Sequence, residues 1–537
     1  MMKKVIKGKK VLAALLAAGL VMGALTACGN ESGGGSSQGG SSTQSSASAD
    51  SGQQAENTDG GADSGEVKTL SIFIDHTWYP IDSFTGAIPE EITKRTGITL
   101  DVTVAVNAEQ LGTMISSGEL PDLVFTQKLF DTLSNEKVCY SYEDLISEYN
   151  VDWEIPAKQL GIARGYSQDG KAYTVLNLFA DTSEWANTQS APMMGSLSYR
   201  RDIYEELGSP AMNNLDDLYN VMGMVKEKYP DMVPLQLNNA WNTEVFKDLV
   251  GIGAVRYEEK EDGTYQHYIR DERYKEMLLW LNKCYASGYL SPDDKFFSEA
   301  SQGFNADGYF FSCGCTQNGI TAANGELAEI DPSYVRYEMK PFDTAYYGQS
   351  SLGWSGTFIS KNCKDPEAAI RFLQQMFTPE MQQLTQMGRE GIDFTFDENG
   401  FPVYSEEWKA SVAADTNKVD YNTWFYLGGS TIIEAEGRVA QMEKEWYEEA
   451  YPEIRKRYEN LPWIEAARPI GEIDEKIAED KVSEMVMPYE QKIIQAATPE
   501  EAAALYDELI TNAEKSGLAS VEAYITEHVA ELMPLYQ

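Results

Sequence analysis

Residues 68–74 read KTLSIFI, residues 98–106 read ITLDVTVAV and residues 120–125 read LPDLVF, and these apolar segments decide the fold. Between the first two, SFTGAIPEEITKRTG begins with helix-start residues and ends at Gly97. The stretch between the second and third segments, up to the Gly/Pro break before the last strand, predicts another short helix. Strands that alternate with helices at this spacing are typical of a parallel sheet covered by helices. The sequence therefore predicts an α/β fold.

The loops that follow the first and third strands are the first candidates for a binding site. In an open α/β sheet the strand-to-helix loops lie on one edge, and that edge binds ligands. The first loop, DHTWYPIDS, carries His76, Trp78 and Tyr79, and we expect these side chains to be exposed and to contact a ligand. The alternative for Trp78 is that it only covers the edge of the sheet. Gln127 follows the third strand and is predicted to lie at the same edge.

Further segments follow in a fixed order along residues 67–537. They are LSYRRDIYEELGSP (197–210), RYKEMLLWLNKCYASGYLSPDD (273–294) and GTFISKNCKDPEAAIRFLQQMFTPE (356–380). Together with PEEITKRTGI and MISSGELPDLVF near the start, they resemble the extracellular solute-binding proteins of ABC importers, in particular the carbohydrate-binding family 1 lipoproteins of Gram-positive bacteria. The order of these segments, rather than any one of them, carries the resemblance.

The resemblance implies a type II periplasmic-binding-protein-like fold, in which a hinge joins two α/β lobes and the ligand binds in the cleft between them. Lobe one would comprise 67–180 plus 350–400, and lobe two 181–345 plus 401–537. The chain would cross between the lobes near NLFADTS and again near FDTAYYGQSS. Both stretches contain small or polar residues that can absorb a hinge rotation.

A sugar-binding site needs aromatic planes for stacking and polar side chains for hydrogen bonds. Trp241 lies in LQLNNAWNTE beside Asn239, and Trp354 lies in SSLGWSGTF at the expected second crossing. By the resemblance, aromatic residues are expected at this crossing, near a third crossing, and on a strand of lobe two that reaches the cleft. The remaining candidates are therefore Trp424, Tyr426 and Tyr309. In contrast, Trp280 lies on the apolar stripe of a predicted helix with Cys284, which predicts a core position.

The N-terminus predicts export and anchoring. Residues 1–27 combine lysines with an apolar run that is shorter than the roughly 20 residues of a membrane-spanning helix. The run ends in Leu-Thr-Ala-Cys, which resembles the lipobox of bacterial lipoproteins, so Cys28 would carry the lipid (a diacylglycerol, with palmitate among its acyl chains) after cleavage. Residues 28–66 are rich in serine and glycine and are predicted to form a disordered tether. The alternative is a secreted protein with an incidental cysteine.

Composition argues against several classes of function. The net charge of −41 disfavours nucleic acid and anionic lipid as partners. The three histidines are scattered, without the spacing of a metal site, and FDENGF lacks the alternating ligands of a calcium loop. We therefore expect no metal and no cofactor. The five cysteines after Cys28 are expected mostly as buried thiols.

These observations lead to one functional hypothesis and two alternatives. We expect a monomeric, lipid-anchored receptor on the extracellular face of the cell membrane that binds a carbohydrate, most simply an oligosaccharide, and delivers it to an ABC permease. Such a protein is not an enzyme. The first alternative is a receptor of the same fold for a peptide or another small solute. The second is a surface glycoside hydrolase, although 84 acidic residues make a suitably spaced carboxylate pair uninformative.

Overall fold

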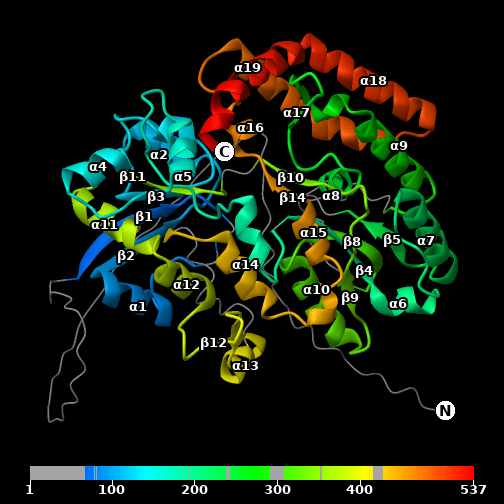
Figure 1. Cartoon of the computed structure of the whole chain (residues 1–537), viewed down its shortest axis with the longest axis horizontal. Helices are drawn as coiled ribbons and strands as arrows, with labels where there is room; N and C mark the ends of the chain where they lie inside the picture. The colour runs from blue at the N-terminus through cyan, green and yellow to red at the C-terminus, as the bar shows by residue number, and fades with distance from the viewer. Residues whose placement is uncertain are drawn as a thin grey trace, which may run out of the picture.

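The computed structural model describes residues 67–536 apart from 78, 80, 193, 238–241, 291–306, 351–352 and 415–426. In this part of the chain two larger sheets, each with its own covering helices, form two lobes that lie side by side (Figure 1). Lobe one contains the N-terminal strands, and lobe two contains the sheet whose first strand begins at Gly195. Among the described helices, none is both long enough and apolar enough to cross a membrane.

The sheet of lobe one has the strand order β2-β1-β3-β11. The central strand β1 (Lys68–Ile74) pairs in parallel with β2 (Ile98–Val104) on one side and β3 (Leu123–Thr126) on the other. The strand β11 (Gly356–Ile359) then pairs antiparallel with β3, so a late segment of the chain completes the sheet of the early segments.

The helices between these strands end where the sequence predicts. The helix α1 (Ala87–Thr96) stops at Gly97, which has a φ of 70° and donates its N–H to the carbonyl of Thr93. The helix α2 (Gln110–Ser117) stops at Gly118, whose φ is 73°. Glycine adopts this left-handed conformation without the strain that a Cβ would cause. The predicted β-α-β-α-β order at the start of the fold is confirmed.

Lobe one extends further along the chain than its predicted end at residue 400. Tyr404 and Trp408 stack with ring centroids 4.0 Å apart, and both are buried in the lobe-one core together with Leu427. The physical reason is strand pairing, because FDENGF connects the antiparallel strands β12 and β13, and both must lie in one lobe. The other elements of lobe one are α3 (Phe130–Leu133), α4 (Tyr142–Glu148), α5 (Ala157–Arg164), α11 (Pro366–Met376), α12 (Pro379–Met387), β12 (Phe394–Phe396), β13 (Pro402–Tyr404) and α13 (Glu406–Ala414).

The sheet of lobe two has the strand order β5-β8-β4-β9. The strand β8 (Tyr309–Cys315) is antiparallel to β4 (Gly195–Arg200) and parallel to β5 (Val233–Gln236), and β9 (Arg336–Glu338) is antiparallel to β4. The register pairs Gly195 with Cys315 at one end of the sheet, and Tyr309 with Val233 at the other end.

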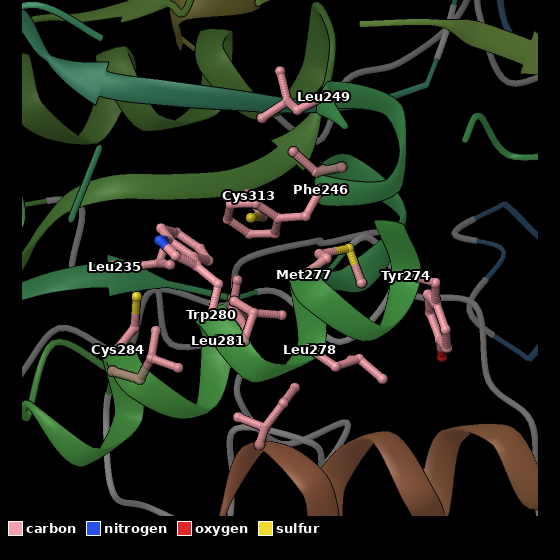
Figure 2. Packing of buried hydrophobic residues seen from close by; sticks show 14 of the residues in the cluster. Leu235, Phe246, Leu249, Tyr274, Met277, Leu278, Trp280, Leu281, Cys284 and Cys313 are labelled. Atoms are coloured by element: carbon pink, nitrogen blue, oxygen red, sulfur yellow. The ribbon is translucent and has the colours of Figure 1, made fainter. Parts of the chain in front are cut away.

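The helix α9 (Glu272–Ala286) supplies much of the core of lobe two (Figure 2). Trp280 is 8% exposed, lies against Phe246 with ring centroids 5.4 Å apart, and donates its indole N–H to the carbonyl of Leu215 at 3.0 Å. Cys284, one turn further along, is fully buried as a free thiol. The predicted core positions of Trp280 and Cys284 are confirmed.

The C-terminal helices complete lobe two. The helices α17 (Asp474–Ile494) and α18 (Pro499–Lys515) pack on each other and on α9, and α19 (Leu518–Tyr536) packs on α17. The remaining elements of lobe two are α6 (Arg201–Glu206), α7 (Leu215–Lys228), α8 (Asn242–Leu249), β6 (Tyr257–Glu259), β7 (Tyr265–His267), η2 (Tyr268–Arg270), α10 (Asn318–Ile330) and α16 (Pro462–Ala466).

Three chain segments run side by side between the lobes, and backbone hydrogen bonds join them. Asn177 donates its N–H to the carbonyl of Ser355 at 2.9 Å, and Leu178 donates its N–H to the carbonyl of Gly429 at 2.8 Å. We call residues 176–179, 353–356 and 428–430 the crossing segments. The elements between the lobes are η1 (Thr182–Asn187), β10 (Tyr347–Gln349), α14 (Thr431–Val439), η6 (Lys444–Trp446), α15 (Tyr451–Arg457) and β14 (Tyr458–Asn460).

Candidate functional site

The topological switch point of lobe one lies between β1 and β3. The chain passes from β1 to β2 on one side of the sheet and then to β3 on the other side. In open α/β sheets a crevice forms outside the carboxyl ends of two such strands, and ligands bind there. His76 follows β1 and Gln127 follows β3, so these two predicted site residues lie at the switch point.

An aromatic group covers this edge of the sheet. The rings of His76 and Trp354 are stacked, with centroids 4.9 Å apart and an interplanar angle of 23°. Phe125, at the end of β3, lies 5.3 Å from His76 and 5.8 Å from Trp354. His76 is only 4% exposed, whereas Trp354 is partly exposed. The structure thus brings together two predicted site residues from distant parts of the sequence, and Trp354 presents the accessible part of the pair.

The backbone around Trp354 explains why its ring lies on His76. Trp354 donates its backbone N–H to the carbonyl of Asn177 at 3.0 Å, which ties it to the first crossing segment. The preceding residue, Gly353, has a φ of 102°, and a Cβ at this position would lie 2.5 Å from the same carbonyl oxygen. Only glycine fits so close an approach with a positive φ. The position of the tryptophan therefore depends on the packing of two crossing segments.

A buried carboxylate and a lysine lie beside the aromatic group. Asp75 is 5% exposed, and its Oδ2 accepts a hydrogen bond from the Thr126 hydroxyl at 2.9 Å. The Lys128 ammonium lies 3.3 Å from this oxygen and donates to the carbonyl of Ala108 at 2.6 Å. Burial raises the pKa of Asp75, although Thr126 and Lys128 oppose the shift. The carboxylate and the carbonyl hold the half-exposed ammonium in a defined position.

The imidazole of His76 is neutral at physiological pH. Burial lowers the pKa of His76 to about 4, and the positive charge of Lys128 acts in the same direction. A neutral ring can stack on tryptophan without bringing a charge to the site. The stacked rings therefore offer an apolar surface without a charge of their own, which suits the C–H face of a ligand.

Two exposed aliphatic residues at the same edge were missed by sequence reasoning. Val106 is 81% exposed because β2 ends at Val104, two residues before the end of the predicted strand. Leu129 is 37% exposed and has a φ of 58°, which is strained for a residue with a Cβ. Lys128 was missed as well. The only available signal was their position after strands β2 and β3, since none of these residue types marks a binding site.

The other predicted site residues are not at this edge or lie outside the described residues. Tyr79 is 5% exposed and packs in the lobe-one core, since its N–H bonds to the carbonyl of His76 at 3.0 Å and the loop turns back over the sheet. The expected exposure of the loop is thus wrong for His76 and Tyr79. Tyr309 lies at the end of the lobe-two sheet away from Gly195, where its carbonyl accepts a hydrogen bond from Arg336. Outside the described residues lie Trp78, Asn239, Trp241, Trp424 and Tyr426.

No group of three or more histidine, cysteine or acidic side chains in the described part of the chain has the arrangement of a metal site. Cys139, Cys313 and Cys363 are buried free thiols, like Cys284. The polar side chains at the switch point can donate and accept hydrogen bonds, and the rings of His76 and Trp354 can stack. Both kinds of interaction are used in ligand binding.

Comparison with known proteins identifies the fold. No protein-family model matches the chain, and no curated protein matches it. Solved structures match nearly its whole folded part. An HMO-binding, ABC-transporter-associated solute-binding protein from Bifidobacterium longum infantis gives a TM-score of 0.64 at 12% identity, covering 86% of this chain and 98% of that one.

Two further solved structures match the fold of this chain. The alginate-binding protein AlgQ2 gives a TM-score of 0.62 at 18% identity, covering 87% of this chain and 98% of that one. The substrate-binding protein FusA of S. pneumoniae, solved with kestose, gives a TM-score of 0.61 at 15% identity, covering 87% of this chain and 99% of that one. At these identities the similarity establishes the two-lobe solute-binding-protein fold, as predicted.

Proposed function

We propose that this chain is the substrate-binding protein of an ABC importer, and that it binds an oligosaccharide at the switch point of lobe one. The observation that carries the proposal is the stacked pair of His76 and Trp354, placed beside Gln127 and a half-exposed Lys128. The solved structures of the same fold support it, because those named above include an alginate-binding protein, an HMO-binding protein and a protein solved with kestose.

Each part of this edge has a role in the proposed binding. The partly exposed ring of Trp354 offers an apolar plane for the C–H face of a pyranose or furanose ring. Gln127 and the Lys128 ammonium offer donors to sugar hydroxyls, and the Asp75 carboxylate holds the ammonium in place. Val106 and Leu129 extend the apolar surface on either side. We retain Trp78, Asn239, Trp241, Trp424 and Tyr426 as further candidates.

Ligand capture would occur by closure of the lobes about the crossing segments. These segments are short and, apart from Gly356, lie outside the strands of both sheets, so they can absorb a rotation without breaking either sheet. A ligand that contacts both lobes stabilises the closed arrangement by its extra contacts there. No bond is made or broken in this process, and the protein is therefore proposed to be a carrier and not an enzyme. It would act as a monomer, anchored through Cys28, and deliver its ligand to the permease.

The proposal is tested by thermal unfolding of residues 66–537 with and without ligands. The panel contains kestose, maltotetraose, alginate oligosaccharides, mannose-containing glycans and short mixed peptides. A ligand at about 100 times its Kd stabilises the native state by about 2.7 kcal/mol, which raises the Tm by a few degrees. We expect such a shift with one family of glycans, and a shift about half as large in Trp354→Ala at the same ligand concentration.

Two outcomes would contradict the proposal. A rise in the Tm with peptides alone would identify the protein as a peptide receptor of the same fold. New reducing ends after long incubation with a stabilising glycan would identify a hydrolase. Lys94→Ala, on the exposed face of α1 away from the switch point, is the control for a general effect of surface substitution.

A further inference from the structure

The C-terminal helix α19 belongs mainly to lobe two. Val521, Ile525 and Val529 follow one face of the helix and are at most 1% exposed. They pack in one cluster with Tyr257 of β6 and Ile464 of α16. This apolar face holds the first turns of α19 against the hairpin and the short helix, so the helix is a rigid part of lobe two. A helix of 19 residues is about 28 Å long, enough to reach beyond the lobe that holds it.

The last turn of α19 also packs on lobe one. Tyr536 is 2% exposed and forms a cluster with Ile162 of α5 and Leu176 of the first crossing segment. Its side chain lies close to the helix at Gly161, where an added Cβ would be 3.8 Å from the hydroxyl oxygen and 3.9 Å from two ring carbons. Figure 1 shows the C-terminus at the junction of the two lobes, beside α16.

This contact lies next to the hinge without being part of the covalent crossings. Leu176 pairs with Gly356 in an isolated bridge, and Phe179, which also borders the Tyr536 cluster, pairs with Ser430. A movement of the crossing segments therefore changes the surface on which Tyr536 rests. A buried aromatic side chain in a close-packed site resists such a change, because interiors tolerate little loss of contact.

We propose that the last turn of α19, through Tyr536, is a noncovalent connection between the lobes that sets their resting orientation. It acts in addition to the three crossing segments. The tyrosine is a positioning residue: it contacts no proposed ligand, and it holds α5 and the first crossing segment in register with lobe two. The inference rests on the two-lobe fold and not on the identity of the ligand, so it can hold even if the proposed function fails.

The experiment measures the distance between the lobes in residues 66–537. Spin labels are placed on exposed positions through Lys94→Cys on α1 and Glu227→Cys on α7, and the protein without these cysteines reports background labelling. Double electron–electron resonance then gives the distance distribution. We expect the wild type to show one narrow population, and Tyr536→Ala to show a broader or shifted distribution while its helix content and cooperative melting are retained.

Matched variants separate the contact from general effects. Tyr524→Ala changes the same residue type on the same helix, away from the Tyr536 cluster, and should leave the distribution unchanged. Gly161→Ala adds a Cβ at ordinary contact distance and should also behave as wild type, whereas Gly161→Leu drives a side chain into the tyrosine ring and should reproduce the effect of Tyr536→Ala. An unchanged distribution in both folded Tyr536→Ala and Gly161→Leu would overturn the proposal. If Tyr536→Ala does not fold, the distance distribution of Gly161→Leu tests the proposal by itself.

Discussion

Replacing Glu338 by glutamine should make the protein more stable at neutral pH. Glu338 ends β9 and is 4% exposed, and its Oε1 accepts a hydrogen bond from the Tyr451 hydroxyl at 3.5 Å. Its Oε2 has no hydrogen-bond partner among the described residues. The carboxyl group borders a small cavity of about 10 Å³ lined mainly by Ser196, Ser198, Ser312 and the first turns of α10. Burial raises the pKa of Glu338 to about 8, against the opposing effect of the Ser196 and Tyr451 hydroxyls.

The sign and size of the effect follow from this pKa. In the unfolded chain the pKa is 4.5, so between pH 4.5 and pH 8 the folded protein holds a proton that the unfolded chain has lost. Stability then falls as the pH rises, by about 1.4 kcal/mol for each pH unit. At pH 7 the wild type has lost about 3 kcal/mol relative to pH 4.5. Glutamine has nearly the same shape and never ionises, so Glu338→Gln should avoid this loss.

The assay is urea-induced unfolding of residues 66–537 at pH 4.5, 6, 7 and 8, followed by tryptophan fluorescence. The difference in free energy of unfolding between Glu338→Gln and wild type should be near zero at pH 4.5 and grow to about 3 kcal/mol at pH 7. Glu329→Gln, an exposed change on α10, controls for the loss of one negative charge from an acidic protein. A difference that stays constant between pH 4.5 and pH 8 would refute the reasoning.

Three further predictions concern the switch point and the crossing segments. Trp354→Ala should weaken binding of a stabilising glycan about tenfold, because one stacking plane is lost; calorimetric titration measures it, and unchanged affinity would exclude this ring from the site. Gly353→Ala should lower the free energy of unfolding by about 1–3 kcal/mol, since the new Cβ meets the Asn177 carbonyl, whereas Gly263→Ala, with a positive φ and open space, should cost less. His76 has a pKa of about 4, below its ordinary 6.5, so its contribution to stability is full above pH 6.5 and is lost as the pH falls towards 4. His76→Asn should remove this part of the acid dependence, and identical pH profiles of the two proteins would contradict it.

Much of the local structure could be predicted from the sequence. The alternation of strands and helices in residues 68–126, the glycine stops of α1 and α2, and the core positions of Trp280 and Cys284 all follow from periodicity and backbone preference. Each of these signals involves only a few neighbouring residues, so it can be read from a short stretch of sequence.

The candidate site could be predicted only in part. His76, Gln127 and Trp354 were identified one by one from residue type and position after strands. The contact between His76 and Trp354 could not be predicted, because it depends on hydrogen bonds between Asn177 and Ser355, which are 178 residues apart. Lys128, Val106 and Leu129 were missed, since lysine and aliphatic side chains occur everywhere on protein surfaces and only the fold places them at a binding edge.

The order of strands and helices in residues 68–126 and the parallel pairing of β1, β2 and β3 therefore follow from the sequence alone. Long-range packing places β13 and α13 in lobe one, Trp354 on His76, and Tyr536 against α5. The physical reason is that helix and strand formation depends on neighbours in the chain. Lobe boundaries and binding surfaces depend on which apolar faces pack against each other. Those faces come from segments that are far apart in the sequence, so neighbouring residues do not reveal them.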